Sequence, residues 1–456
     1  YLSGCHVDRH DFHREAALAL EAGNGVLVAA PTGAGKTIVG EFAIYLALAT
    51  GRKAFYTTPI KALSNQKYHD LVARYGPEAV GLLTGDTSIN GNAQIVAMTT
   101  EVLRNMLYAG SGAVKDLGYV VMDEVHYLAY RFRGSVWEEV IIHLDQSVQL
   151  VSLSATVSNA EEFGDWLTVV RGATSIVVSE RRPVPLWQYV MTAGRGDSPG
   201  GLLDLYAHNV DPTAPGTNPP INPDLLQHMR RADSANVRGG FSGRGGRQGR
   251  GYQGRGGQHG RGGAQHNGRR GPPRFVVLKE LRNAHLLPAI YFIFSRAACD
   301  DAVHQCRAAG LNLTTPEQAE QIRIIAETRC ASIPPEDLAV LGYWSWLEGL
   351  TQGIAAHHAG MLPLFKETVE ELFSRGLIKV VFATETLALG INMPARTVVL
   401  EKLVKWDGTG HVDITPGQYT QLTGRAGRRG IDVEGHAVVV DHPGLDPVAL
   451  AGLASK

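Results

Sequence analysis

The sequence predicts an α/β protein in which two parallel-sheet domains follow one another along the chain. Two segments alternate short apolar runs with amphipathic ones, glycine-rich strings lie towards both ends, and the stretch between the segments lacks hydrophobic periodicity. At 456 residues the chain is also too long for one ordinary core. We expect a first domain over residues 1–180 and a second over 181–456, interrupted by a Pro/Gly/Arg-rich insertion at 191–274.

Each domain should contain a parallel sheet with helices on both faces. Near-continuous runs of Val, Ile, Leu and Phe are typical of strands that are buried on both sides. The helix expected at 37–49 has apolar residues at helical spacing. The expected strands are 26–30, 54–57, 95–98, 119–122 and 149–153 in the first domain, and 289–294, 378–383, 397–400 and 437–440 in the second.

The insertion differs in composition from both domains. From Ser234 to Arg274 it holds nine arginines, no lysine and no acidic residue, which leaves −10 for the rest of a chain whose net charge is −1. Such a segment buries too little apolar surface to offset chain entropy, so we expect 191–274 to be disordered. Arg/Gly tracts with interspersed aromatic residues bind RNA without sequence preference, a role that we favour over a plain spacer.

Composition also excludes several classes of protein. No apolar run approaches the roughly 18 residues that a membrane span requires. Four cysteines in a chain of this length do not make a disulfide framework. We therefore expect a cytoplasmic protein with reduced cysteines, and a monomer.

The string APTGAGKT at residues 30–37, called the phosphate loop below, is typical of nucleotide binding. It lies between the first expected strand and the helix at 37–49, which is the context that such a loop needs. Lys36 should reach the β- and γ-phosphates, and the Thr37 hydroxyl should bind Mg²⁺. The loop residues expected to contact the nucleotide are Pro31, Thr32, Gly33, Ala34, Gly35, Lys36 and Thr37.

An acidic string, DEVH at 123–126, follows the apolar strand expected at 119–122. A carboxylate at a strand end that faces the phosphate loop is where Mg²⁺ coordination is needed. We assign Asp123 to the metal and Glu124 to the attacking water as general base.

A second string, QLTGRAGRRG at 421–430, places arginines among three glycines. Glycines disfavour an ordinary helix face and suit close backbone approach to a ligand. Arg425 and Arg428 are therefore expected to reach the bound phosphate from the second domain and to offset charge on the transferred group. The alternative is a solvated basic turn.

Further strings complete the pattern, and together these motifs resemble the superfamily 2 helicases of the DExH type, in their Ski-like branch. The resemblance covers nearly the whole chain outside the insertion and implies two tandem RecA-like P-loop domains. The additional strings are TPIKALSNQ at 58–66, TGD at 84–86, MTTE at 98–101, SAT at 154–156, FIFS at 292–295, HHAGM at 357–361 and ATETLALGINMP at 383–394.

The resemblance implies ATP hydrolysis with Mg²⁺, 3′→5′ movement along a single strand and separation of the duplex ahead. In such enzymes the two lobes grip the sugar–phosphate backbone, so binding is largely independent of sequence. Gln421 would join the two arginines, and Gly390 and Asn392 would lie towards the nucleotide. The residues implied to hold the strand are Thr58, Lys61, Thr84, Gly85, Thr99 and Thr100 in the first lobe, and Ser295, His358, Gly360 and Thr384 in the second.

Two local features extend the resemblance. Residues 398–415 predict a β-hairpin, which in the family acts as a wedge at the duplex junction. Trp406 beside its turn could stack on an unpaired base, and an ordinary hairpin with an exposed tryptophan is the alternative. His13 stands where the family has a glutamine that reads adenine, and an imidazole cannot reproduce that bidentate contact. We still expect ATP.

The function predicted from the sequence is an ATP-dependent helicase or translocase. RNA, single-stranded or duplex, is favoured over DNA, with RNA-processing or degradation proteins as partners. Members of the branch continue into winged-helix and ratchet domains, so we expect this chain to be a helicase core. An ATP-switched clamp that remodels protein–RNA complexes without strand separation is the alternative. A P-loop kinase is a third reading, which the far-lobe arginines disfavour.

Overall fold

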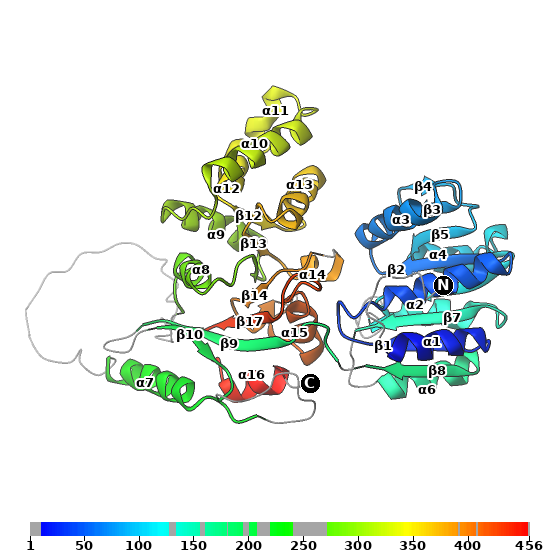
Figure 1. Ribbon diagram of the computed structural model, residues 1–456, viewed down its shortest axis with the longest axis horizontal. Coiled ribbons are helices and arrows are strands. Elements are labelled where there is room, and N and C mark those ends of the chain that lie inside the picture. Colours follow the sequence, from blue (N-terminus) through cyan, green and yellow to red (C-terminus); the bar gives the residue numbers. More distant parts are fainter. Residues whose placement is uncertain are drawn as a thin grey trace, which may run out of the picture.

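The computed structural model describes residues 11–126, 134–155, 160–179, 181–194, 200–207, 219–239, 271–390, 393–406 and 409–454, with the side chains of 232–239 and 389–390 left aside. These residues form two α/β lobes that lie side by side, each built on one large sheet (Figure 1). The predicted fold class is confirmed. No helix of the described part is long and apolar enough to cross a membrane.

The first lobe contains an eight-stranded sheet in the order β4-β3-β5-β2-β6-β7-β1-β8. All neighbouring strands are parallel except β3 and β4. The strands are β1 Gly25–Ala29, β2 Lys53–Thr58, β3 Val80–Leu83, β4 Ser88–Ile89, β5 Ile95–Thr99, β6 Leu117–Met122, β7 Gln149–Ser154 and β8 Thr174–Val178.

Helices cover both faces of this sheet. One buried cluster joins the strands to α1, α2 and α3, and a second joins them to α4, α5 and α6, so the sheet is apolar on both sides. The helices are α1 Asp11–Glu21, α2 Thr37–Ala49, α3 Lys61–Tyr75, α4 Thr100–Tyr108, α5 Gly134–His143 and α6 Ala160–Arg171, with a short 3₁₀ turn at Gly112–Val114.

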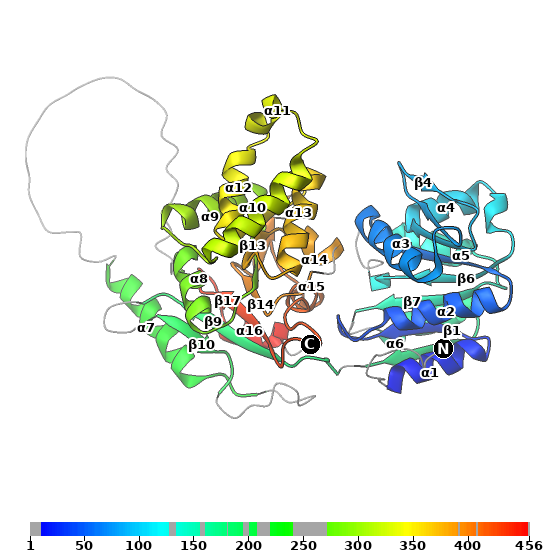
Figure 2. The same ribbon diagram turned by 45° about the horizontal axis from the view of Figure 1, so that its top comes forward.

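The second lobe contains a seven-stranded sheet in the order β10-β9-β17-β14-β11-β13-β12, antiparallel only between β9 and β10. The chain passes from β8 of the first lobe to β9 of this sheet (Figure 2). The strands are β9 Leu186–Thr192, β10 Gly201–Asp204, β11 Ala289–Phe292, β12 Ile354–His357, β13 Val380–Ala383, β14 Thr397–Leu400 and β17 Gly435–Val440.

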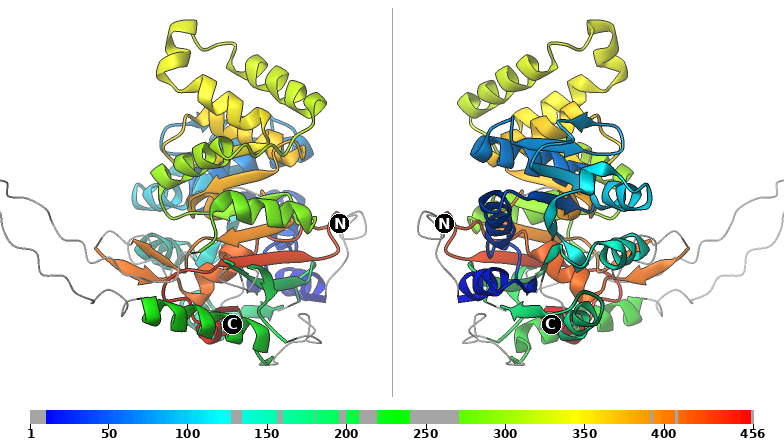
Figure 3. Two further views of the ribbon diagram at one scale, coloured as in Figure 1. Left: turned by 90° about the vertical axis from the view of Figure 1, so that its left-hand side faces the viewer. Right: turned by 90° about the vertical axis from the view of Figure 1, so that its right-hand side faces the viewer.

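Helices α10, α11 and α12 project from the second lobe (Figure 3). The three described cysteines of this lobe are buried and unbridged. The helices are α7 Pro223–Gly239, α8 Arg274–Asn283, α9 Arg296–Ala308, α10 Pro316–Cys330, α11 Pro335–Val340, α12 Tyr343–Thr351, α13 Pro363–Ser374, α14 Thr386–Gly390, α15 Pro416–Thr423 and α16 Pro447–Ala454.

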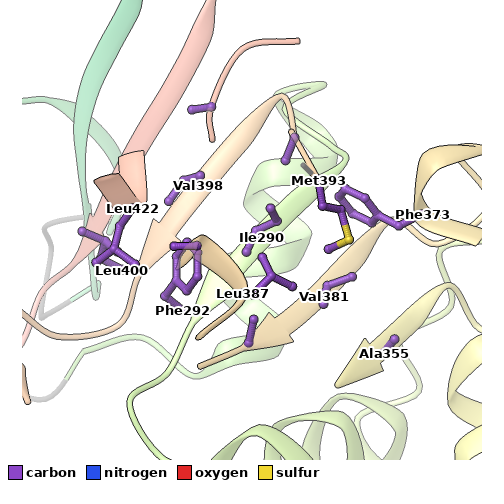
Figure 4. Close-up of a cluster of buried hydrophobic side chains, with 14 of the residues drawn as sticks. Ile290, Phe292, Ala355, Phe373, Val381, Leu387, Met393, Val398, Leu400 and Leu422 are labelled. Atoms are coloured by element: carbon purple, nitrogen blue, oxygen red, sulfur yellow. The ribbon is translucent and has the colours of Figure 1, made fainter. Parts of the chain in front are cut away.

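The core of the second lobe anchors the segment that carries the arginine string. Leu422 of α15 and Leu387 of α14 belong to the same buried cluster as Val398 and Leu400 of β14 (Figure 4). Because α15 is packed on this core, the position of the residues that directly follow it is fixed relative to the sheet of the second lobe.

The expectation of disorder over 191–274 is wrong for the described part of that stretch. Strand β10 pairs with β9, Tyr206 bridges Ile221, and α7 buries Leu225 and Met229 in the core of the second lobe. The physical reason is spacing, since two apolar residues four apart make one helical face in an otherwise polar segment. Residues 240–270, which carry most of the Arg-Gly-Gly repeats, lie outside the described residues.

The carboxyl end of the same stretch is also ordered. Arg274 begins α8 and makes a bidentate ion pair with Glu401, with Nε–Oε2 and Nη2–Oε1 distances of 2.7 and 2.8 Å. A Cβ on Gly271 would lie 2.2 Å from the Asp441 carbonyl oxygen, so the backbone is packed tightly there. Arg274 therefore belongs to the second lobe and not to the insertion.

Candidate nucleotide and nucleic-acid sites

The phosphate loop connects β1 to α2, as the sequence predicts. Gly33 and Gly35 have φ values of +82° and +87°, which side chains rarely adopt. Lys36 Nζ donates hydrogen bonds to the carbonyl oxygens of Ala30 at 2.7 Å and Pro31 at 3.3 Å. Burial lowers the pKa of Lys36, while nearby Glu124 and Asp123 oppose that shift.

Asp123 follows β6, on the same edge of the sheet as the phosphate loop. Its carboxylate accepts hydrogen bonds from the Tyr56 hydroxyl at 2.7 Å and from the Glu124 backbone N–H at 2.9 Å. Burial and the neighbouring Glu124 raise the pKa of Asp123 to about 6, against the hydrogen bond from Tyr56 and the charges of Lys67 and Lys36. A cation beside this carboxylate would relieve the cost of its charge.

Glu124 adopts a positive φ of +57°, the left-handed region, which turns the chain sharply after the strand. Glu124 Oε2 lies 3.4 Å from Nδ1 of His126, and the same ring nitrogen accepts the Ala155 N–H at 3.4 Å. Burial lowers the pKa of His126, and the neighbouring Glu124 opposes that shift. His126 thus connects the acidic string to the end of β7, a role that the sequence prediction missed.

Residues 424–430, called the arginine turn below, follow α15 and reach the phosphate loop. A Cβ on Gly424 would lie 3.1 Å from Thr32 Oγ1, and one on Gly35 would lie 3.3 Å from Arg429 Nη1. Arg425 donates from Nη2 to the carbonyl oxygen of Ala388 in α14 and contributes to the lowered pKa of Lys36. The structure therefore brings the arginine turn and the phosphate loop together, although almost 400 residues separate them in the sequence.

Arg428 has a different partner. Its Nε and Nη2 donate to both carboxylate oxygens of Asp432 at 2.8 and 2.9 Å, and its backbone N–H donates to the same carboxylate at 2.8 Å. These bonds raise the pKa of Arg428, although burial opposes the shift. The arginine whose side chain lies against the loop is Arg429, which sequence reasoning did not select although it belongs to the same string.

The remaining predicted nucleotide contacts are only partly described. Gln421 lies in the last turn of α15, and Gly390 ends α14. Asn392 lies outside the described residues. His13 is buried, lies tilted against Phe12 with ring centroids 3.9 Å apart, and places Nε2 3.1 Å from the Gly35 carbonyl oxygen. Since a carbonyl only accepts, Nε2 carries a proton, and this edge of the ring faces the loop.

Two of the first-lobe residues expected to hold a strand bond within their own lobe. Thr58 Oγ1 donates to the Ile60 carbonyl oxygen at 3.0 Å and lies 2.7 Å from Ser64 Oγ. Thr100 Oγ1 donates to the Thr58 carbonyl oxygen at 3.2 Å. These buried hydroxyls shape the turns before α3 and α4, whose N-termini carry the free N–H groups that phosphates favour.

The other first-lobe candidates lie beside those turns. Thr84 Oγ1 donates to Asp86 at 3.1 Å, and Lys61 pairs with the same carboxylate at 2.5 Å. A Cβ on Gly85 would meet nothing within 4 Å, and Thr99 stands at the N-cap position of α4. Gly85 and the largely exposed Lys61 are therefore the accessible members of this set.

The second-lobe candidates are mostly committed to local contacts. Ser295 Oγ caps α9 by accepting the Ala298 N–H at 3.4 Å, and Thr384 Oγ1 lies 2.9 Å from Thr386 Oγ1. His358 is buried, with Nε2 3.0 Å from Asp300 and Nδ1 accepting the Gly360 N–H at 3.2 Å. This ring holds the turn that presents Gly360, and its direct contact with a strand stays a prediction.

The expected hairpin is present as β15 Val404–Trp406 and β16 His411–Asp413, which pair antiparallel. Trp406 is 58% exposed and meets His411 edge-on, with ring centroids 5.3 Å apart. Lys405 pairs with Glu385 at 2.7 Å, which connects the hairpin to the start of α14. An exposed indole on a hairpin that is held in place can stack on a base.

Comparison with known proteins decides the family. Residues 10–163 match the family described as DEAD/DEAH box helicase, and residues 312–430 match the helicase conserved C-terminal domain. A "Probable helicase HelY" from Mycobacterium tuberculosis is 58% identical over 445 residues, 98% of this chain and 47% of that protein. The chain belongs to the Ski-like DExH-box helicases.

Two further relatives come from eukaryotes. The chloroplastic "DExH-box ATP-dependent RNA helicase DExH15" of Arabidopsis thaliana is 42% identical over 94% of this chain and 36% of its own length. Human "Superkiller complex protein 2" is 40% identical over 94% of this chain and 32% of its own length. The chain thus spans about a third to a half of the curated relatives it matches.

The described residues offer few groups to a metal ion. The described residues contain no group of three or more His, Cys, Asp or Glu side chains that could enclose a metal ion. Asp123 and the Thr37 hydroxyl fit Mg²⁺ in another way, because this ion keeps several waters and binds one or two protein groups together with substrate phosphates.

Proposed function

We propose that the helicase hydrolyses ATP with Mg²⁺ and couples hydrolysis to 3′→5′ movement along RNA. The observation that carries the proposal is the meeting of the arginine turn with the phosphate loop, at Gly424–Thr32 and Arg429–Gly35. Two lobes that meet at the nucleotide can convert its cleavage into a change in their relative position.

In the proposed mechanism, Lys36 exchanges its bonds to the Ala30 and Pro31 carbonyls for the β- and γ-phosphate oxygens. Thr37 and Asp123 would hold Mg²⁺, which supplies charge neutralisation at the phosphates. Glu124 accepts a proton from the attacking water as the γ-phosphate bond to the β-phosphate oxygen breaks.

The second lobe completes the site. Arg425 and Arg428 offset the charge that develops on the transferred phosphoryl group, and Gln421 orients it with them. Arg428 reaches this position only by leaving Asp432, to which it is held by two side-chain hydrogen bonds. Arg429 stays against Gly35 and aligns the turn.

RNA is favoured over DNA for two reasons. The arginines of residues 240–270 form a tract of the kind that binds RNA, and two relatives carry RNA or an RNA-associated complex in their names. "Exosome RNA helicase MTR4" also suggests RNA-degradation proteins as partners. We further propose that the protein is monomeric and acts in the cytoplasm.

ATP turnover should be measured with matched single strands of RNA and DNA, and strand displacement with duplexes that carry a 3′ or a 5′ overhang. We expect RNA to stimulate turnover more than DNA, and the 3′ overhang alone to support displacement. Lys36→Ala should abolish both. Equal turnover with and without either strand would contradict the proposal. RNA-stimulated turnover without displacement would favour the ATP-switched clamp instead.

A further inference from the structure

The segment between the two sheets makes contacts that the nucleotide chemistry does not use. It runs from the end of β8 at Val178 to the start of β9 at Leu186. Within it, Arg181 is exposed, Arg182 is half-buried and Val184 is buried. A connection that served only as a tether between lobes would not need a cation packed into it.

Arg182 binds the arginine turn directly. Its Nη2 donates to the Ala426 carbonyl oxygen at 3.1 Å, and its Nε donates to the Val184 carbonyl oxygen at 3.4 Å. Ala426 lies between Arg425 and Arg428. One guanidinium therefore fixes the backbone of the connecting segment to the backbone of the turn that carries both arginines.

The backbone of the turn also packs against this segment. Gly427 has a φ of +86°, and a Cβ there would lie 2.6 Å from Val184 Cγ1. The Gly435 N–H donates to the Pro185 carbonyl oxygen at 2.8 Å. Further along the chain, the Tyr419 hydroxyl of α15 donates to Gln188 Oε1 of β9 at 2.5 Å.

The same segment also approaches the phosphate loop. A Cβ on Gly33 would lie 3.8 Å from Pro183 Cγ, which is ordinary van der Waals contact. Residues 182–184 are thus placed between the nucleotide loop of one lobe and the arginine turn of the other.

Among the described residues, no carboxylate pairs with Arg182, and burial lowers its pKa to about 10. A half-buried guanidinium loses part of its hydration, and two carbonyls replace that hydration only in part. An apolar side chain would fill the same space without this cost, so packing alone does not explain the arginine.

We propose that Arg182 is a positioning residue that holds the arginine turn to the connecting segment. When the lobes rotate relative to one another, the segment and the turn then move together, and this movement places Arg425 and Arg428 at the phosphate. The proposal rests on the function proposed above. Movement of residues 182–184 would then move Ala426 with them, because Arg182 Nη2 is bonded to the Ala426 carbonyl oxygen and Gly427 packs against Val184. A displacement of about 1 Å at a reacting group is enough to lower turnover about 100-fold.

The test compares Arg182→Met with Arg181→Met, which removes the neighbouring exposed arginine. Turnover is measured at saturating ATP with polyuridylic acid, and the Kd of a fluorescent ATP analogue and the Tm are measured alongside. For Arg182→Met we expect kcat to fall between about 10- and 100-fold, with a Kd within about twofold of the unaltered chain. Arg181→Met should match the unaltered chain in all three measurements.

Arg182→Lys keeps the charge, but it replaces the planar fork, whose Nε and Nη2 reach the two carbonyls separately, by a single donor nitrogen. We expect its kcat to fall as well, and this variant decides the matter if Arg182→Met does not fold. Full turnover in Arg182→Lys, or turnover in Arg182→Met equal to that of Arg181→Met, would overturn the proposal. The proposal would also be overturned if Arg182→Met lowered ATP affinity and Tm together with kcat, because a loss of all three indicates a structural role only. An unaltered chain without RNA-stimulated turnover would overturn the proposed function as well.

Discussion

The two lobes bring their nucleotide-site residues to the interface in different ways. In the first lobe, Lys36, Asp123 and Glu124 follow the carboxyl ends of β1 and β6, so the sheet itself places them. In the second lobe, Arg425 and Arg428 lie on a turn after α15, and their side chains bond to different partners.

This difference shows which part of a site follows from topology and which from local contacts. Parallel strands meet at one edge of their sheet, and ligands bind beyond that edge. A turn has no such constraint, and neighbouring arginines point to Ala388, Asp432 and Gly35 according to the acceptor each finds. Rearranging the arginine side chains of the second lobe should therefore cost less free energy than rearranging the phosphate loop of the first lobe.

The largest effect is expected for a substitution in the arginine turn. Arg428→Ala should lower kcat between about 10³- and 10⁵-fold with ATP affinity retained, because its guanidinium acts on the phosphoryl group during transfer. Arg429→Ala should lower kcat less. Single-turnover hydrolysis and binding of a fluorescent ATP analogue separate the two. A greater loss in Arg429→Ala would show that the arginine already lying against Gly35 is the one that acts.

The corresponding change in the first lobe is Glu124→Gln. It removes the proton acceptor and should lower turnover between about 10²- and 10⁴-fold, with nucleotide binding kept. Glu138→Gln, at an exposed position of α5, is the matched control and should leave turnover unchanged. Turnover of Glu124→Gln that matches this control would remove Glu124 from the mechanism.

A third prediction concerns stability and pH. The pKa of Asp123 near 6 lies above its usual 3.8, so the folded chain holds this proton more tightly than the unfolded chain. Ionisation therefore costs stability as pH rises from about 4 to 6, and the full cost persists above. Asp123→Asn should be more stable by about 1–3 kcal/mol near pH 8, with no gain near pH 4.

Thermal melting with a metal chelator would measure this difference. Asp86→Asn is the control, because Asp86 is exposed and its pKa is lowered by its hydrogen bonds to Lys61 and Thr84, so it should show no gain near pH 8. Equal effects of the two substitutions would contradict the role of burial at Asp123.

The smallest effect is expected for the arginines outside the turn. Residues 240–270 contain seven arginines, and changing all of them to glutamine keeps the length of the segment. RNA affinity should fall, and the slope of log K against log salt should become shallower by up to about 5 if every arginine meets a phosphate. Turnover without RNA should not change. An unaltered slope would leave the tract as a spacer.

Sequence reasoning succeeded where a residue pattern carries its own geometry. The phosphate loop, the strand before Asp123 and the hairpin at Trp406 are found where expected, because glycine spacing, apolar runs and turn residues act locally. It failed at α7, where Leu225 and Met229 lie in a mostly polar segment and give only a weak helical pattern. The burial of His358 was equally invisible, since its partner Asp300 is 58 residues away.

By itself, the sequence determined the fold class, the nucleotide loop and the family, since these depend on local patterns that survive any arrangement of the lobes. The tertiary structure decided which arginine faces the loop, which one Asp432 holds, and that Arg182 ties the connecting segment to Ala426. The reason is physical: a guanidinium bonds to whichever acceptor folding places within about 3 Å, and that acceptor can come from anywhere in the chain.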